Sequence, residues 1–154
     1  MISTIAQFNG VDIDLAVSIA ETESYFDENA VRFEAGWKYV FNCDGYAKAS
    51  RISEDTERVL QMCSWGMMQV MGTVARELGF RGNLLELTKP ELGVKFGCLK
   101  LKELMGKYSY SDDLIAAYNA GTPRKVDGKY SNETYVAKVR GLYAARKSKS
   151  FTKP

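Results

Sequence analysis

The chain has 154 residues, of which 45% are hydrophobic, 26% charged and 12% aromatic. This is the composition of one compact globular domain rather than of a disordered or fibrous chain. The net charge of +2 gives no reason by itself to expect nucleic acid as a partner. The absence of histidine excludes Ser-His-Asp and Cys-His catalysis and histidine-ligated zinc. Acid–base chemistry near neutral pH must therefore come from carboxylates, tyrosines, lysines or thiols.

The cysteines and the N-terminal segment exclude several further classes of protein. Cys43, Cys63 and Cys98 are widely spaced and form no CxxC pair, so we expect reduced, buried thiols. The first ten residues lack a basic region followed by an apolar run, and no stretch approaches the roughly 18 apolar residues of a membrane span. We expect no classical export signal, no membrane insertion, no metal and no cofactor.

The first predicted element is a helix over residues 11–24. At about 100° per residue, one side gathers the apolar residues Ile13, Ala16, Val17, Ile19 and Ala20. Glu23 falls in the middle of this apolar arc, whereas Glu21 falls on the polar side with Asp14 and Ser18. A carboxylate on an apolar face must be paired or functional, unless it emerges into water at the helix end. Desolvation disfavours its charged form, which suits a general acid.

The middle of the chain is less regular. Residues 29–53 are rich in turn formers and aromatics, and Asp44-Gly45 could turn a hairpin there, with a long loop as the alternative. Helices are predicted over residues 53–63 and 66–78, the second ending at Gly79.

The C-terminal half predicts more helices. They cover about residues 90–105, the segment through Leu114 and Tyr118, and the region after a polar loop at 122–130. The expected fold class is mainly α, in a single domain over residues 1–154 with room for one small β-hairpin. The 17 residues from Lys138 onward contain six basic and no acidic residues, which predicts a cationic tail from about residue 146.

Three segments stand out by their order along the chain. They are Glu23-Ser24, then Ser64-Trp65-Gly66-Met67-Met68-Gln69-Val70-Met71, then Ala116-Ala117-Tyr118-Asn119-Ala120-Gly121. This series resembles the lytic transglycosylases of the soluble-transglycosylase, lysozyme-like superfamily, in which ES, GLMQ-type and AYNAG-type segments line one sugar-binding groove. The resemblance covers roughly residues 10–145 and is to a compact form often encoded by bacteriophages. Met67 departs from the usual leucine, and the interval from Glu23 to Gly66 is longer than in the simplest members.

The resemblance implies a lysozyme-like fold and a peptidoglycan lytic transglycosylase. Glu23 would protonate the β-1,4 bond between N-acetylmuramic acid and N-acetylglucosamine, then deprotonate the muramyl 6-hydroxyl to close a 1,6-anhydro ring. One carboxylate suffices because the 6-hydroxyl is an internal nucleophile of high effective molarity. Tyr118 resembles the family tyrosine that hydrogen-bonds the catalytic acid.

The same resemblance implies residues that contact the sugars. These candidates are Ser24, Gln69, Met71, Asn119 and Tyr135, although Ser24 could instead serve only the helix end. Glu34 could supply the second carboxylate with which a hydrolytic lysozyme activates water, and a salt bridge with Arg32 is the alternative.

The leading hypothesis for function is thus a lytic transglycosylase that acts on peptidoglycan glycan strands as a monomer. The close alternative is a goose-type muramidase assisted by Glu34 or Asp44. A non-catalytic wall-binding module is a further alternative, and a nucleic-acid binder, based only on the basic end, is the weakest. With no export signal, we expect cytoplasmic synthesis and passage to the wall through a holin or as part of a virion, as in a phage endolysin or phage-associated lysin.

Overall fold

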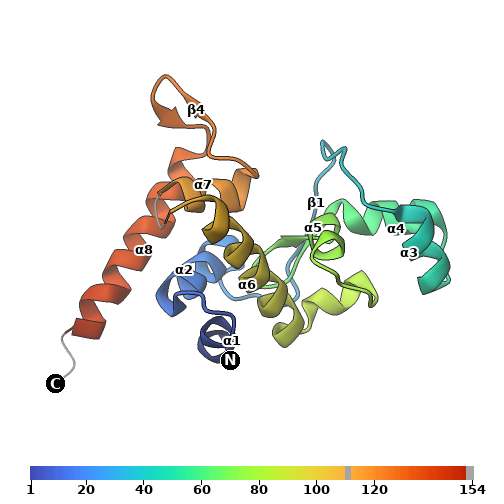
Figure 1. Ribbon diagram of the computed structural model, residues 1–154, viewed down its shortest axis with the longest axis horizontal. Helices are drawn as coiled ribbons and strands as arrows, with labels where there is room; N and C mark the ends of the chain where they lie inside the picture. Colours follow the sequence, from blue (N-terminus) through green and yellow to red (C-terminus); the bar gives the residue numbers. More distant parts are fainter. Residues whose placement is uncertain (110–111, 152–154) are drawn as a thin grey trace. The chain divides into compact units, whose positions relative to one another are not determined.

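The computed structural model describes residues 1–109 and 112–151 of the chain (Figure 1). Contacts divide the chain into two compact units, a terminal unit of Met1–Thr22 with Cys98–Pro154 and a central unit of Glu23–Gly97. The described residues are mainly helical, with small antiparallel sheets, which confirms the predicted fold class. The assignment of all residues to a single domain stays a prediction.

The terminal unit is an assembly of helices with a hairpin. Its elements are α1 (Ile2–Phe8), most of α2 (Ile13–Ser24), the later part of α6 (Pro90–Lys107), α7 (Asp112–Ala120), β4 (Lys125–Val126), β5 (Lys129–Tyr130) and α8 (Glu133–Phe151). Helix α7 packs against α8. Their apolar faces form part of a core in which Leu114, Ala117, Val136 and Val139 are almost fully buried.

The buried face of α2 differs in part from the predicted one. Ala16, Ile19 and Ala20 are buried as expected, but Ile13 is exposed. Ser18, predicted on the polar side, is fully buried, and its hydroxyl donates to the carbonyl of Asp14 at 2.6 Å. A serine can be buried in this way because the helix backbone itself satisfies its hydroxyl group.

The central unit combines short helices with a three-stranded sheet. Its elements are β1 (Val31–Phe33), α3 (Cys43–Ser50), α4 (Glu54–Gln61), β2 (Cys63–Trp65), β3 (Val70–Met71), α5 (Gly72–Glu77) and the 3-10 helix η1 (Leu84–Thr88), before the first turns of α6. The strands are antiparallel in the order β1-β2-β3. Val31 lies opposite Trp65, and Ser64 lies opposite Met71.

The helix predicted over residues 66–78 is wrong in its first half. Residues 66–69 instead form the turn between β2 and β3, where Gly66 and Gln69 have φ angles of 67° and 46°. A right-handed helix cannot contain such left-handed residues. A Cβ atom at Gly66 would lie 2.5 Å from the Leu87 carbonyl oxygen, so glycine is required here for space as well as for backbone conformation. The predicted end at Gly79 is confirmed by its φ of 91°.

Neither alternative for Asp44-Gly45, a hairpin or a long loop, is correct, because both residues lie in the first turn of α3. The hairpin of the terminal unit lies instead within residues 122–130, which were predicted as a loop. Its turn residues, Asp127 and Gly128, have φ angles of 50° and 78°. Two successive positive φ angles are typical of the type I′ turn that matches the twist of paired strands.

The central unit contains a fully buried ion pair. Arg76 Nε and Nη2 donate to Glu57 Oε1 and Oε2 at 2.8 and 3.0 Å, and both side chains are 0% exposed. Arg76 Nη1 donates to the carbonyls of Phe80 and Gly82. Gln61 Nε2 donates to Glu57 Oε1 at 2.9 Å. The buried charges are therefore both paired and hydrogen-bonded, as burial requires.

The three cysteines are free and buried, which confirms the prediction for them. Burial raises the pKa of the Cys43 and Cys63 thiols, and it raises the pKa of Cys98 to about 11. The neutral thiol is therefore favoured at all three positions near neutral pH.

The predicted cationic tail begins inside a helix. Residues 146–151 belong to α8, and residues 152–154 lie outside the described residues. Arg146 pairs with Glu21, and Lys147 Nζ lies 2.7 Å from Asp12 and 3.1 Å from Asp14. These cations are thus engaged with α2 and the residues that precede it.

We predict that Arg76→Met destabilises the protein by about 3–5 kcal/mol, because it leaves the Glu57 carboxylate buried without a counter-charge. The free energy of unfolding from urea titration measures the loss. Arg58→Met is the matched control, since it removes an exposed pair with Glu54 and should cost no more than about 0.5 kcal/mol. Equal losses in the two variants would contradict the assigned importance of the buried pair.

Candidate functional site

Glu23 and Ser24 form the last turn of α2, and both are half-buried. The helix stops because Tyr25 and Phe26 adopt left-handed conformations, with φ angles of 59° and 66°. For bulky residues this costs on the order of 1–2 kcal/mol each. Such strain persists only where surrounding contacts over-determine the backbone, and it is common next to functional groups.

A hydrogen bond joins the first motif to the second within the central unit. Ser24 Oγ donates to the Met67 carbonyl oxygen at 2.8 Å, although the two residues are 43 positions apart. Met67 lies in the turn between β2 and β3. The residue next to Glu23 is therefore tethered to the turn that carries the GLMQ-type segment.

Gln69 holds that turn together. Its Nε2 donates to the carbonyls of Ala30 and Gly66 at 3.0 and 2.9 Å, and its Oε1 accepts from Ser64 Oγ at 2.9 Å. Both amide hydrogens are thus used inside the protein, so a sugar could still reach only an Oε1 lone pair. Met71 follows in β3 and is 9% exposed. The roles of Gln69 and Met71 in sugar binding stay predictions.

Glu34 occupies the salt bridge that the sequence offered as its alternative. Its Oε1 lies 2.6 Å from Arg32 Nε, and Ser64 Oγ is 3.5 Å from the same oxygen. Asp44, the other acid considered for a hydrolytic mechanism, pairs with Lys48 one helical turn away at 2.8 Å. A catalytic role for either carboxylate stays a prediction.

The third motif lies in α7 of the terminal unit. Tyr118 is buried, and Lys100 Nζ lies 4.1 Å from the centroid of its ring. Asn119 is exposed, and its Oδ1 accepts from Asn132 Nδ2 at 3.0 Å. Tyr135 is half-buried in the first turn of α8.

Asn132 was not among the predicted site residues. Besides its contact with Asn119, its Nδ2 donates to the Ala116 carbonyl at 3.1 Å. It therefore ties the end of α7 to the start of α8, although the motif itself gives no sign of this partner 13 residues away.

The predicted site residues thus gather in two groups, each within one unit. The central unit holds Glu23, Ser24, Gln69, Met71 and Glu34, and the terminal unit holds Tyr118, Asn119 and Tyr135. A hydrogen bond between Tyr118 and Glu23, which the resemblance implies, stays a prediction.

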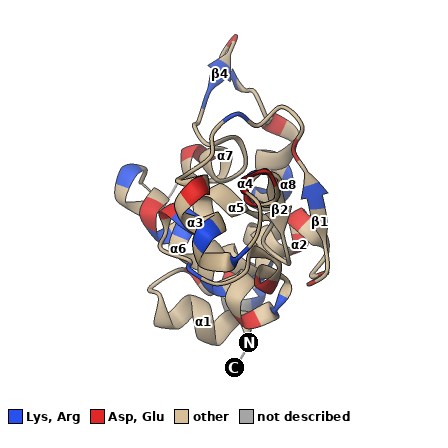
Figure 2. Ribbon diagram, turned by 90° about the vertical axis from the view of Figure 1, so that its right-hand side faces the viewer, with Lys and Arg blue, Asp and Glu red and all other residues tan. Residues whose placement is uncertain are grey.

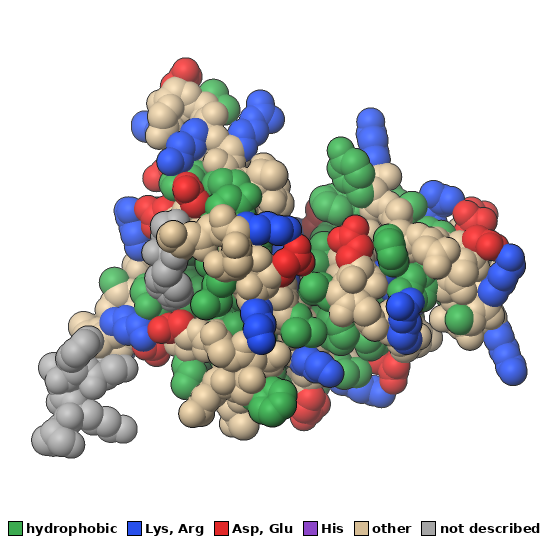
Figure 3. Space-filling model, viewed as in Figure 1, with side chains coloured by type: hydrophobic (Ala, Val, Ile, Leu, Met, Phe, Trp, Pro, Cys, Tyr) green, Lys and Arg blue, Asp and Glu red, His purple; other side chains and the backbone are tan. Residues whose placement is uncertain are grey.

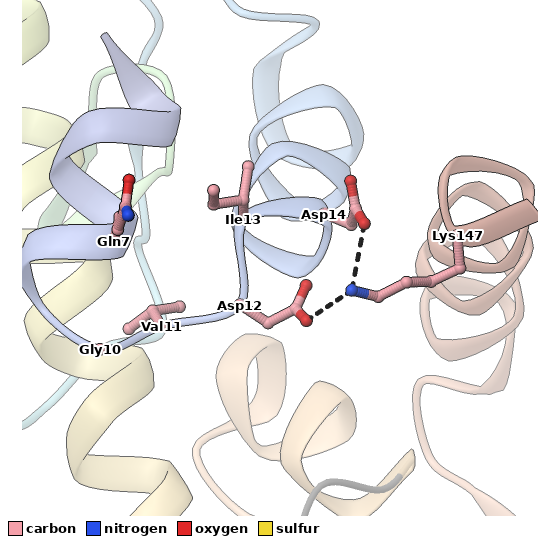
Figure 4. A pocket seen from close by; sticks show the side chains of 7 residues that line it. All are labelled: Gln7, Gly10, Val11, Asp12, Ile13, Asp14 and Lys147. Atoms are coloured by element: carbon pink, nitrogen blue, oxygen red, sulfur yellow. Dashed lines mark hydrogen bonds and ion pairs between the residues drawn. The ribbon is translucent and has the colours of Figure 1, made fainter. Parts of the chain in front are cut away.

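The terminal unit also contains a depression with a different set of lining residues (Figure 4). It is lined by Gln7, Gly10, Val11, Asp12, Ile13, Asp14 and Lys147. Lys147 bridges the two carboxylates, and its hydrogen bond to Asp12, supported by the one to Asp14, raises the pKa of the lysine. Since none of the predicted site residues lines this depression, it is not the site that the motifs indicate.

Comparison with known families decides the assignment. A family model described as the transglycosylase SLT domain matches residues 1–138. The chain belongs to the transglycosylase SLT family. The match includes all three motifs and confirms the resemblance to lytic transglycosylases. The SLT domain acts on peptidoglycan with an activity of the lytic transglycosylase type.

Comparisons with curated proteins and with solved structures give no match. In the described part of the chain, His, Cys, Asp and Glu form no group of three or more that could hold a metal ion. Across residues 1–109 and 112–151, no helix is both long and apolar enough to cross a membrane.

We predict that Ser24→Ala lowers the free energy of unfolding by about 1 kcal/mol, because the Met67 carbonyl loses its hydrogen-bond donor. Chemical denaturation measures this change. Ser131→Ala is the matched control at an exposed position, and it should change the stability by less than about 0.5 kcal/mol. If both variants match the wild type, the Ser24 tether contributes nothing.

Proposed function

We propose that this SLT domain cleaves the β-1,4 bond between N-acetylmuramic acid and N-acetylglucosamine and leaves 1,6-anhydromuramyl ends. One observation carries the proposal. The residue after Glu23 is tethered at 2.8 Å to the turn of the GLMQ-type segment, so the end of α2 and this turn form one local structure. The SLT family match over residues 1–138 supports the same conclusion.

In the proposed reaction Glu23 serves first as an acid and then as a base. Its proton passes to the glycosidic oxygen as the bond from the muramyl C1 breaks, and the N-acetylglucosamine leaves with that proton. The muramyl 6-hydroxyl then attacks C1, and its proton returns to Glu23. No water is consumed, and the carboxyl group ends in its starting state.

The surroundings of the other acids favour this reaction over hydrolysis. A hydrolase of this type requires a second carboxylate that activates water or attacks the sugar. Glu34 forms an ion pair with Arg32, and Asp44 forms an ion pair with Lys48. An internal nucleophile removes the need for either group.

Mass spectrometry of the muropeptides released from purified Gram-negative peptidoglycan tests the proposal. We expect anhydromuramyl products from the wild type and a loss of at least about 100-fold in rate for Glu23→Gln, which cannot donate the proton. Glu77→Gln, at an exposed position, is the matched control and should retain full activity.

A further variant separates the two reaction types. Glu34→Gln should keep the anhydromuramyl products, because no second carboxylate takes part. Reducing muramyl ends, lost in Glu34→Gln, would establish a muramidase instead. Wall binding without any product would favour a non-catalytic module.

We also propose that the chain is a bacteriophage lysin that is made in the cytoplasm and reaches the wall through a holin. The resemblance to the compact, phage-encoded form of the domain supports this proposal. Expression in a Gram-negative host together with a holin should lyse the cells, whereas the lysin without the holin should not. Lysis at the same rate without the holin would overturn this route.

A further inference from the structure

In the terminal unit, the positive charges that remain accessible to a ligand are not those that the sequence suggested. The basic end of the sequence is largely compensated along α8. Arg140 pairs with Asp112, Arg146 with Glu21, and Lys147 with two aspartates. The hairpin formed by β4 and β5 is therefore a better candidate for an anion-binding surface than the C-terminal end.

This hairpin, residues 124–130, carries a concentrated positive charge. Arg124, Lys125 and Lys129 oppose Asp127, which gives the segment a net charge of +2. In Figure 2 the ribbon of this hairpin is blue at basic positions and red at its tip, and Figure 3 shows basic side chains over the same segment. Arg124 and Lys129 are exposed, and neither forms a salt bridge with the described residues.

Contacts at its base make the hairpin a fixed arm rather than a loose loop. The Tyr130 hydroxyl donates to Asp113 of α7, and Lys125 Nζ lies 3.6 Å from the same carboxylate. The hydrogen bond from Tyr130, together with Lys125, lowers the pKa of Asp113. The backbone N–H of Tyr130 donates to Glu133 Oε2 at 3.0 Å. The backbone of the arm is therefore held in place before a ligand binds, and only the side chains of Arg124 and Lys129 need to be ordered.

The arm is also fixed relative to the third motif. It lies beside the C-terminal end of α7 and the N-terminal start of α8 (Figure 1). Asn132, two residues after β5, donates to both Ala116 and Asn119. A ligand held at Asn119 would thus meet the arm in a constant position.

We propose that Arg124 and Lys129 on this arm bind the carboxylates of the peptide stems that the glycan strand carries. The inference rests on the proposed function, in which peptidoglycan strands are the ligand, and on the sugar contact that the resemblance implies for Asn119 of α7. Peptide stems branch from muramic acid, and they combine free carboxylates with small apolar side chains. The arm matches both features, since Val126, 51% exposed, lies between the two cations. A polyphosphate would use the charges but not the apolar contact.

The test compares soluble glycan strands that carry stems with the same strands stripped of stems by an amidase. Binding is measured in the Glu23→Gln background, so that cleavage does not interfere. We expect Arg124→Gln/Lys129→Gln to lower the affinity for stem-bearing strands by about tenfold and to leave the affinity for stripped strands unchanged. The control is Arg51→Gln/Lys102→Gln, which removes the same charge at exposed positions elsewhere and should alter neither affinity.

The anchor of the arm gives a second, independent variant. Tyr130→Phe removes the hydrogen bond to Asp113 but keeps every positive charge. It should reduce the preference for stem-bearing strands by several-fold if the fixed position of the arm matters. Thermal unfolding measured alongside confirms that the variants are folded.

Three results would overturn the proposal. An unchanged preference for stem-bearing strands in Arg124→Gln/Lys129→Gln would show that the arm does not bind the peptide stems. An equal loss on both kinds of strand, or a similar loss on a teichoic acid, would show a general anion-binding surface. Because binding is measured without turnover, stem recognition without any cleavage by the wild type would reject the proposed function and leave this inference intact.

Discussion

The central unit depends on the buried pair of Glu57 and Arg76. Two charges removed from water are tolerated only when each is paired and hydrogen-bonded, and here the partners come from α4, from α5 and from the backbone after α5. Helix α4 leads directly into β2, and α5 follows directly from β3. The pair therefore clamps the two helices that flank the β2–β3 turn, and the turn has little freedom to move.

From that turn the constraint passes to the end of α2. Gln69 closes the turn with its side-chain amide, and the Met67 carbonyl receives the hydroxyl hydrogen of Ser24. Glu23 is thus attached by one neighbouring residue to a structure that is itself held by buried charges. A carboxyl group that must donate and then accept a proton at a defined atom has to be held in a fixed position. Even a small displacement of the carboxyl group slows proton transfer.

Local pattern predicted part of this structure well. The helix α2 and its end near Ser24 follow from periodicity, whereas the three motifs follow from the resemblance to the family. The same Asp-Gly signal, however, lies in a helix at Asp44-Gly45 and turns a hairpin at Asp127-Gly128. The difference lies in whether the flanking residues find strand partners, and such pairing is not a local property. The partners of the Glu57–Arg76 pair are 19 residues apart and follow no periodic pattern, so the pair could not be predicted from the sequence.

The left-handed conformations of Tyr25 and Phe26 set a limit on how this protein can be stabilised. Glycine or asparagine at these positions would relieve strain, so ordinary stability engineering would begin there. Both positions lie directly after Glu23-Ser24, and relief would let the helix end relax away from its present direction. The substitutions that raise the melting temperature most readily would thus fall at Tyr25 and Phe26, where a change of backbone conformation would displace Glu23. Stabilising substitutions are better placed on the exposed helix surfaces of the terminal unit.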